Sequence, residues 1–358
     1  MKIAVTKVSP ENLKKKPPKG AALGFGKMFS DHMFLIDYDK GKGWHDARIE
    51  PYHSLSLDPA TIVLHYGQGI FEGLKAYRWQ NGEIWLFRPK ENYERLNFSA
   101  RRLCMPEIST DDALEATREL IRVEKDWVPS EPGSSLYIRP TMIATEVAVG
   151  VHVAAKYLFY IIVGPVGAYY PQGFSPTDIY ITEKYTRAAM GGLGEAKTMA
   201  NYAASLLAQE EAHQLGYTQV LWLDPVERKY VEEVGTSNIF FYLGDELVTP
   251  ALTGTILAGI TRGSVIRMAR DWGMKVSERR ISLDEVLAAL ERGTLKEAFA
   301  TGTAATISPV GKLAYRGRTY SVNDGKVGPL AQRLYDTIMG IQYGKVKDPY
   351  GWVEKVAN

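Results

Sequence analysis

The sequence predicts a mixed α/β protein of the α+β type, with two domains and much antiparallel sheet. Three observations predict it. The chain has 358 residues, which is more than a single domain normally contains. Short segments rich in β-branched and aromatic residues alternate with helical periodicities along its length. A glycine- and proline-rich stretch then indicates a boundary, which predicts a domain over 1–165, a linker over 166–177 and a domain over 178–358.

The first half contains four segments with strand composition and two with helical spacing. Pro89 suits the first position of a helix that continues through Cys104, which we expect to belong to the core. A second helix is predicted from Thr110, a plausible N-cap, to Trp127. The predicted strands of this half are 33–38, 83–88, 135–143 and 157–163.

The second half begins with strands at 178–183 and 219–224, separated by a helix over 199–215 that ends at Gly216. A hairpin-like pair is predicted from VEEVGTSNIFFYL and ELVTP, which are joined by a Gly-Asp turn. The remaining predicted helices are 262–272, 282–291 and 328–342. Strands and helices are therefore mixed in both halves.

Composition excludes several classes of protein. The net charge of +2 gives no electrostatic footprint for nucleic acid. No stretch approaches eighteen apolar residues, so no membrane span is expected. With one cysteine, the chain forms no internal disulfide, which fits a reducing compartment and a cytoplasmic location. The six histidines have no ligand spacing, so no metal site is predicted, and the chain has no G-x-S-x-G elbow.

The segment GGLGEAKT (191–198) delivers Lys197 after a glycine-rich approach and just before a predicted helix. Glycines let the backbone pass close to a bulky group. If Lys197 is buried, desolvation lowers the pKa of its amine, which can then form a Schiff base. Two alternatives stay open: a surface lysine beside a flexible loop, or a phosphate-binding P-loop followed by a strand ending in Asp224. Ala196 stands where a P-loop requires glycine, which disfavours the latter.

Three further segments carry groups that could bind a cofactor. In EEVGTSN (232–238), one glutamate could hold a pyridine nitrogen protonated, or both could be solvated acids of a surface hairpin. LAGITR (257–262) opens a helix, whose backbone N–H groups favour phosphate, although an ordinary helix start is the plainer interpretation. TGTAA (301–305) is a turn of small residues after an apolar strand, and it can offer N–H groups to an anion.

In this order, the segments resemble one family: the branched-chain amino-acid aminotransferases, which are fold type IV pyridoxal-phosphate (PLP) enzymes. The resemblance runs from about Phe25 to Tyr343. It implies two domains with PLP in the cleft between them and Lys197 in the C-terminal domain. The matching segments are FSDHM (29–33), LHYGQGIFEGLKAY (64–77), LFRP (86–89), SLYIRP (135–140), GGLGEAKTMANY (191–202), EEVGTSNIFF (232–241), ILAGITR (256–262) and TGTAATISPV (301–310).

The resemblance also implies a role for each matching residue. Lys197 is similar to the lysine that forms the Schiff base and moves the proton between the substrate Cα and the cofactor C4′. Glu233 matches the partner of the pyridine nitrogen, and Tyr202 matches the partner of the ring hydroxyl. The residues implied for the phosphate are Arg88, Ile260, Thr261 and Thr303.

The implied activity is reversible transamination of L-leucine, L-isoleucine and L-valine with 2-oxoglutarate, in a homodimer. Thr236 and Ala304 match positions near the α-carboxylate, and Arg139 and Tyr66 match groups for the second carboxylate of glutamate. The residues implied for the side-chain pocket are Phe25, Tyr66, Phe71 and Tyr137. A D-amino-acid aminotransferase or an aminodeoxychorismate lyase of the same fold remains an alternative.

Overall fold

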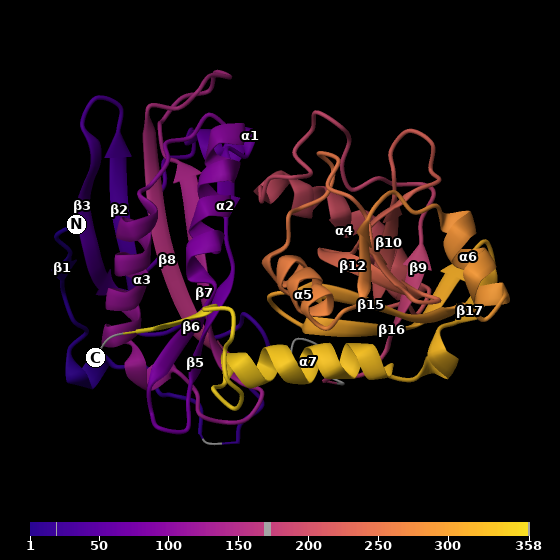
Figure 1. The fold of residues 1–358 in the computed structure, drawn as a ribbon. Helices are drawn as coiled ribbons and strands as arrows, with labels where there is room; N and C mark the ends of the chain where they lie inside the picture. Colours follow the sequence, from indigo (N-terminus) through magenta and orange to yellow (C-terminus); the bar gives the residue numbers. More distant parts are fainter. Residues whose placement is uncertain (19, 168–172, 357–358) are drawn as a thin grey trace. The chain divides into compact units, whose positions relative to one another are not determined.

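The computed structural model describes residues 1–18, 20–167 and 173–356, which fall into two units (Figure 1). Unit 1 is Met1–Pro171, Ala196–Met199 and Gly340–Asn358, and unit 2 is Gln172–Glu195 and Ala200–Met339. This division differs from the one predicted from sequence, because two segments of the second half group with unit 1. Of the predicted linker, residues 168–172 lie outside the described residues.

Both segments join unit 1 through backbone pairing. Thr198 bridges Ile70, and the carbonyl oxygen of Lys197 accepts a hydrogen bond from Phe71 N–H. Near the C-terminus, β18 (Val353–Lys355) pairs antiparallel with β6 (Ile84–Phe87). Pairing across more than 100 residues of sequence leaves no local signal, which is why composition alone assigns these segments to the C-terminal domain.

Unit 1 contains a sheet in the order β1-β3-β2-β8-β7-β5-β6-β18, with β4 paired to β7. Its neighbours are antiparallel, except that β1 runs parallel to β3. The predicted strands of this half are confirmed, and several strands were not predicted. The remaining bounds are β1 Ala4–Val5, β2 His32–Asp39, β3 Gly43–Pro51, β4 Gly69–Phe71, β5 Leu74–Arg78, β7 Ser135–Ala144 and β8 Lys156–Val166.

Two helices, α2 (Pro89–Arg102) and α3 (Thr110–Val123), pack against one face of this sheet through a shared apolar core (Figure 1). Pro89 occupies the first turn as predicted. The cap of α3 is Ser109 rather than Thr110, since its hydroxyl accepts from Asp112 N–H. The core position predicted for Cys104 is wrong: the residue is exposed in the turn after α2.

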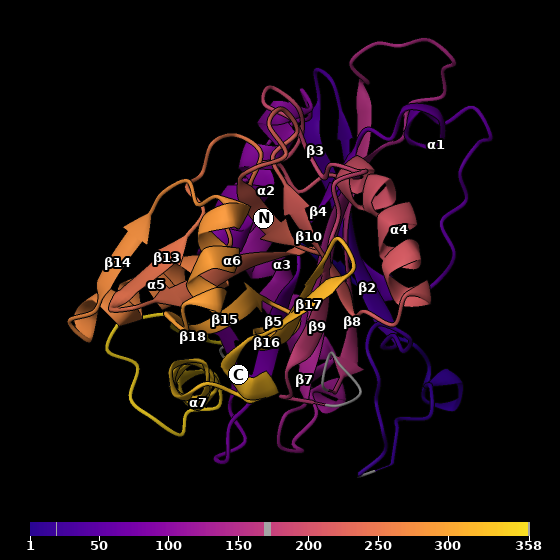
Figure 2. The same ribbon diagram turned by 90° about the vertical axis from the view of Figure 1, so that its right-hand side faces the viewer.

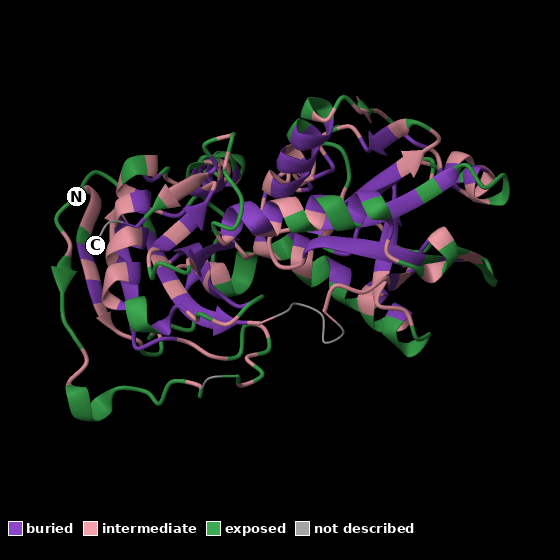
Figure 3. Ribbon diagram, turned by 60° about the horizontal axis from the view of Figure 1, so that its bottom comes forward, coloured by how far each residue is buried: buried purple, intermediate pink, exposed green. Residues whose placement is uncertain are grey.

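Short helical pieces complete unit 1. Helix α1 spans Ile62–Tyr66, and the 3-10 helices η1 and η2 span Pro10–Asn12 and Lys125–Trp127. The predicted second helix therefore ends at Val123, and Trp127 belongs to η2. Figure 3 shows that the strands are largely buried, whereas much of the N-terminal arm is exposed.

Unit 2 has a mixed sheet in the order β11-β10-β9-β16-β15-β12-β13-β14, with β17 paired to β16. Strand β11 also pairs with β12, which closes a ring of strands. β9 runs parallel to β10 and β16, and β13 runs parallel to β14. The bounds are β9 Thr177–Ile181, β10 Gln219–Leu223, β11 Val231–Val234, β12 Ser237–Leu243, β13 Glu246–Thr249, β14 Lys275–Glu278, β15 Leu295–Gly302, β16 Thr306–Tyr315 and β17 Arg318–Ser321.

The helices of the second half begin and end close to the predicted positions (Figures 1 and 2). α6 packs on the core formed by Leu221 and Leu223 of β10, and α4 packs on Val220 and Trp222 of the same strand. Because successive strand residues point to opposite faces, these helices cover opposite faces of β10. The bounds are α4 Met199–Gln214, α5 Ile260–Asp271, α6 Leu283–Glu291, η3 Asn323–Gly325 and α7 Pro329–Gln342.

Across the described ranges, no helix is both long and apolar enough to cross a membrane.

Candidate active site

Lys197 lies in a segment of unit 1 whose backbone is held from two sides. Its carbonyl oxygen accepts from the N–H of Phe71 at 3.1 Å, and its own N–H donates to the hydroxyl of Ser99 at 2.9 Å. Its Nζ lies 5.2 Å from the centre of the Phe71 ring. The residue is half-buried rather than buried. Its backbone is thus fixed, and its amine is directed over an aromatic face.

The glycine-rich approach to Lys197 has a steric reason at Gly194, within unit 2. A Cβ at this position would lie 2.3 Å from the Thr255 carbonyl oxygen and 2.6 Å from the Ala188 Cβ. Arg187 donates from Nη2 to the Gly194 carbonyl oxygen at 2.9 Å and also to the Thr255 carbonyl oxygen. The backbone therefore passes close to a neighbouring loop, as the sequence predicts for glycine.

An aromatic cluster with one arginine adjoins the Phe71 ring in unit 1. The Arg139 guanidinium carbon lies 4.7 Å from the centre of that ring, and Nη2 donates to the Tyr137 hydroxyl at 3.0 Å. Phe25 packs edge-on against Tyr137, with ring centres 4.9 Å apart. Phe71 thus has Lys197 and Arg139 as neighbours in one apolar site, which could hold an alkyl chain or an acidic one.

Tyr66 does not join this cluster in the described part of the chain. It ends helix α1, its side chain is 42% exposed, and its described ring contact is with His65. A role for Tyr66 in this pocket would therefore require a neighbour beyond the described contacts.

Arg88 is held in a strained conformation before helix α2. Its φ is +48° and its ψ is +47°, a left-handed conformation that costs a non-glycine residue roughly 1–2 kcal/mol. Its N–H donates to the Trp352 carbonyl oxygen at 2.7 Å, and its Nε donates to Glu91 at 2.8 Å. The guanidinium lies 5.3 Å from the Trp352 ring. Such strain persists where surrounding contacts fix a residue, and it is common at functional sites.

In unit 2, Glu233 is a buried carboxylate on β11, 2% exposed, with several donors around it. Its Oε1 accepts from Asn238 Nδ2 at 3.1 Å and from the Leu257 backbone N–H at 2.8 Å. Its Oε2 lies 3.0 Å from Arg187 Nε. These contacts offset the cost of burying a carboxylate and fix its orientation.

Arg187 was missed by sequence analysis, although it contacts Glu233. It stands outside every segment that the sequence singles out, and 46 residues separate the two partners. The basic residues nearest to Glu233 in the sequence are Arg228 and Lys229, so nothing in the sequence indicates Arg187 as its partner.

The remaining residues predicted for unit 2 gather at one end of its sheet. Thr236 lies in the turn between β11 and β12, and Thr303 and Ala304 lie in the loop between β15 and β16. Strands β12 and β15 are antiparallel neighbours, with Asn238 opposite Thr301, so this turn and this loop are adjacent.

The N-terminus of α5 lies at the same end of the sheet. Ile260 and Thr261 are the first residues of the helix, and a Cβ on the preceding Gly259 would lie 1.9 Å from Asn238 Oδ1. Tyr202 is half-buried on α4. A carboxylate, the N–H groups at a helix N-terminus and threonine hydroxyls are thus close together in this unit.

These groups fit PLP chemically. Glu233 can accept a hydrogen bond from a protonated pyridine nitrogen, and the first N–H groups of α5 can donate to a phosphate. Thr301 Oγ1 is buried beside them and has no hydrogen-bond partner among the described residues. In unit 1, Thr198 Oγ1 directly after Lys197 is likewise buried without a described partner.

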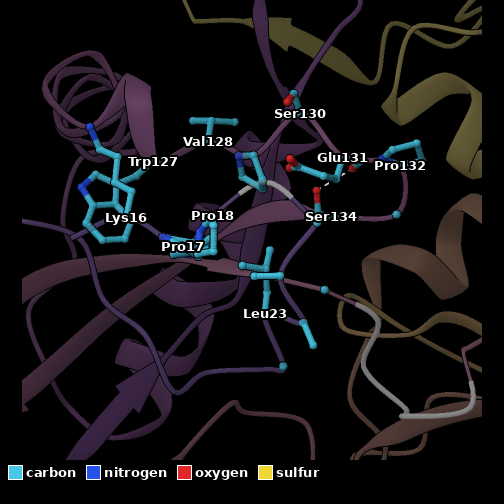
Figure 4. Close-up of a pocket in the computed structure, with 18 of the residues that line it drawn as sticks. Lys16, Pro17, Pro18, Leu23, Trp127, Val128, Ser130, Glu131, Pro132 and Ser134 are labelled. Atoms are coloured by element: carbon cyan, nitrogen blue, oxygen red, sulfur yellow. Dashed lines mark hydrogen bonds between the residues drawn. The ribbon is translucent and has the colours of Figure 1, made fainter. Parts of the chain in front are cut away.

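A cavity lies in unit 1 between the N-terminal arm and residues 126–134, away from Lys197 (Figure 4). Its volume is about 1060 Å³, and Lys16, Pro17 and Pro18 line it together with Trp127 and Val128. Phe25 contributes to its wall, but Lys197 and Arg139 do not. The volume of a cavity therefore does not identify the candidate active site. Among the described residues, no group of histidine, cysteine and acidic side chains could hold a metal ion.

The family model for amino-transferase class IV matches residues 69–313, more than half of the chain. The chain belongs to the class IV aminotransferase family. The match spans both units and includes Lys197, Arg88 and Glu233. This match excludes the P-loop alternative. The glycine-rich segment before Lys197 is part of a different fold.

Among relatives of this class IV aminotransferase is branched-chain-amino-acid transaminase 1 of Bacillus subtilis (strain 168). It is 54% identical over 343 residues, which cover 96% of each chain. The crystal structure of the Escherichia coli branched-chain amino acid aminotransferase matches with a TM-score of 0.76 and 28% identity. The match covers 91% of this chain and 99% of that chain.

The branched-chain amino acid aminotransferase from Thermobaculum terrenum, in its PLP form, matches with a TM-score of 0.73 and 25% identity, over 93% of this chain and 100% of that chain. These structures confirm the predicted mixed α/β fold. Class IV aminotransferases use PLP, and that relative is a holoenzyme with this cofactor.

Proposed function

We propose that the chain catalyses reversible transamination of L-leucine, L-isoleucine and L-valine with 2-oxoglutarate, using PLP. The observation that carries this proposal is the placement of the Lys197 amine. It lies over the Phe71 ring, which also contacts Arg139. An amine, an apolar ring and a guanidinium in one unit match the demands of two substrates, one alkyl and one acidic. The relatives named above are a branched-chain-amino-acid transaminase and a branched-chain amino acid aminotransferase, which supports a branched-chain amino acid as one substrate.

Lys197 holds the cofactor covalently and moves the proton between the substrate Cα and the cofactor C4′. PLP, when bound, supplies an electron sink for the electron pair that is left on Cα. The backbone contacts to Phe71 and Ser99 fix the Cα of Lys197. The amine therefore travels only by rotation of its own side chain, which suits a base that acts repeatedly at one place.

Glu233 keeps the pyridine nitrogen protonated, and Arg187 helps to keep Glu233 charged and oriented. The phosphate is bound by Arg88, by the N–H groups that open α5 and by Thr303. The strained backbone of Arg88 sets the direction of its guanidinium, whose planar fork suits two phosphate oxygens. Tyr202 binds the ring hydroxyl.

The substrate's side chain packs on Phe25, Phe71 and Tyr137, and the second carboxylate of glutamate binds Arg139. Arg139 Nε is buried without a described hydrogen-bond partner, so it retains a donor for that carboxylate. Thr236 and Ala304 bind the α-carboxylate. We also propose a homodimer, in which Tyr66 completes the pocket. Light scattering measured on the purified protein tests the dimer.

Borohydride reduction of the purified holoenzyme, followed by peptide mass spectrometry, tests the role of Lys197. We expect the phosphopyridoxyl group on Lys197 and loss of the half-reaction with L-leucine in Lys197→Ala. Lys184→Ala is the control, because Lys184 is a surface residue paired with Glu211. A label on another lysine, or full activity of Lys197→Ala, would refute the proposal. Spectra recorded with L- and D-leucine separate it from D-amino-acid aminotransferase activity.

A further inference from the structure

A separate cavity lies in unit 2, beside the hairpin that joins β10 and β11. Its volume is about 400 Å³, within the range of small-molecule sites. Its wall is largely apolar and includes Met190, Val226, Pro250, Ala251 and Ile256. Met190 and Val226 are 73% and 83% exposed. The cavity therefore has an apolar interior and apolar residues at its entrance.

Glu232 is one of two buried carboxylates that line this cavity, the other being Asp224. Glu232 is 5% exposed, and its Oε1 accepts from the Thr255 hydroxyl at 2.5 Å. Its Oε2 is buried and receives no hydrogen bond from any residue that the structure describes. Burial raises the pKa of Glu232, because the charged form is poorly solvated there. A donor supplied by a ligand would compensate this oxygen.

The other charged residues of the wall already have partners. Asp224 accepts four backbone N–H groups of the hairpin, from Val226, Glu227, Lys229 and Tyr230, at 2.7–3.2 Å. Arg280 pairs with Glu227 at 3.1 Å and stacks on the Tyr230 ring at 3.5 Å. Among the charged groups of the wall, Glu232 is thus the one with a buried oxygen that accepts no described hydrogen bond.

We propose that this cavity binds a small organic cation, a protonated amine that carries a short apolar group. Its N–H donates to Glu232 Oε2, and its apolar part packs on Pro250, Ala251 and Ile256. A metal ion does not fit, because it would need several oxygen or nitrogen ligands and the wall offers one uncommitted carboxylate. The wall of the cavity includes neither Glu233 nor any other residue proposed to bind PLP, so this site is distinct from the one proposed for PLP.

Calorimetric titration of the holoenzyme with N,N-dimethylisobutylammonium chloride tests the proposal. The nitrogen of this probe bears three carbon substituents, so it forms no imine with PLP, and binding is separated from cofactor chemistry. We expect saturable binding of one cation per chain. Glu232→Gln keeps the shape and the acceptor for Thr255 but removes the charge, and it should weaken binding at least about tenfold.

A second variant and a control make the result decisive. Ala251→Phe fills the cavity without altering Glu232, and it should abolish saturable binding. Glu227→Gln removes a partly exposed carboxylate at the rim, and it should change affinity by less than about threefold. Unchanged affinity in Glu232→Gln, an equal loss in Glu227→Gln, or no saturation up to roughly 10 mM would each overturn the proposal.

Discussion

Replacing Gly73 by alanine would displace Tyr137 from the proposed substrate pocket. A Cβ at position 73 would lie 2.1 Å from the Tyr137 hydroxyl oxygen and 2.9 Å from its Cζ. Non-bonded carbon and oxygen atoms need more than 3 Å, so the hydroxyl must move by about 1 Å. The Arg139 Nη2 to Tyr137 hydroxyl distance of 3.0 Å would then exceed the range of a hydrogen bond.

Two interactions are lost or weakened together. A hydrogen bond to a charged donor contributes about 1.5–3 kcal/mol, and the edge-on contact of Phe25 with Tyr137 contributes about 0.5–1.5 kcal/mol. If about 2–4 kcal/mol of this is lost in the transition state, kcat/KM for 2-oxoglutarate falls by roughly 30-fold to 1000-fold. Folding stability should change less, because the displaced atoms are the end of one side chain.

Steady-state kinetics with each substrate, together with thermal unfolding, measures both effects. Gly150→Ala is the matched control, since its Cβ would meet only His152 Nδ1 at 3.8 Å. Tyr137→Phe removes the clashing oxygen, so adding Gly73→Ala to it should cost less than adding it to the parent. Equal costs in both backgrounds, or an active Gly73→Ala enzyme with unchanged kcat/KM, would show that this contact does not shape the pocket.

Two further predictions concern stability. Glu72 is 0% exposed and accepts two hydrogen bonds from Arg95, of 2.7 and 2.9 Å. Glu72→Gln should therefore lower the free energy of unfolding, measured in urea, by about 3 kcal/mol. The control Glu94→Gln on the surface should lower it by less than about 1 kcal/mol. An equal effect of the two changes would contradict the importance of burial. Burial lowers the pKa of Lys75 to about 8 in the folded chain, whereas it is about 10.4 in the unfolded chain. Between these two pH values the unfolded chain binds more protons than the folded chain, so the free energy of unfolding rises with pH. Lys75→Met should remove about 3 kcal/mol of that rise, as measured by urea unfolding at about pH 7 and pH 10, and an unchanged pH profile would refute it.

Local patterns in the sequence predicted most elements of the fold. Pro89 marks the start of α2, Gly216 follows the end of α4, and the Gly-Asp turn joins β12 to β13. Short-range signals of this kind depend on the conformational limits of single residues, so they survive in any tertiary context. Even here the cap of α3 was misplaced by one residue, because Ser109 and Thr110 offer the same hydroxyl.

The sequence could not predict pairing between distant segments. Lys197 joins unit 1 because its backbone bonds to Phe71 and Ser99, which precede it by about 100 residues or more. Nothing near Lys197 in the sequence carries that information. The contact between Arg187 and Glu233 is equally non-local. The motifs therefore predict which residues carry the chemistry, while only the tertiary structure shows which side chains contact them.

The adjacent glutamates of β11 show how neighbouring residues of one type acquire different chemistry. Neither their order in the sequence nor regular alternation along the strand separates the two roles, because the register of β11 against β10 shifts between Leu221 and Leu223. Glu233 meets Asn238, Leu257 and Arg187, so both of its oxygens are compensated. Glu232 meets the Thr255 hydroxyl with one oxygen and leaves the other uncompensated within the described contacts. A carboxylate with fixed donors on both oxygens can hold one cofactor atom in place, whereas one with an unused oxygen beside a cavity can exchange a small cation. The partners, rather than the residue type, distinguish the roles that we propose for the two glutamates.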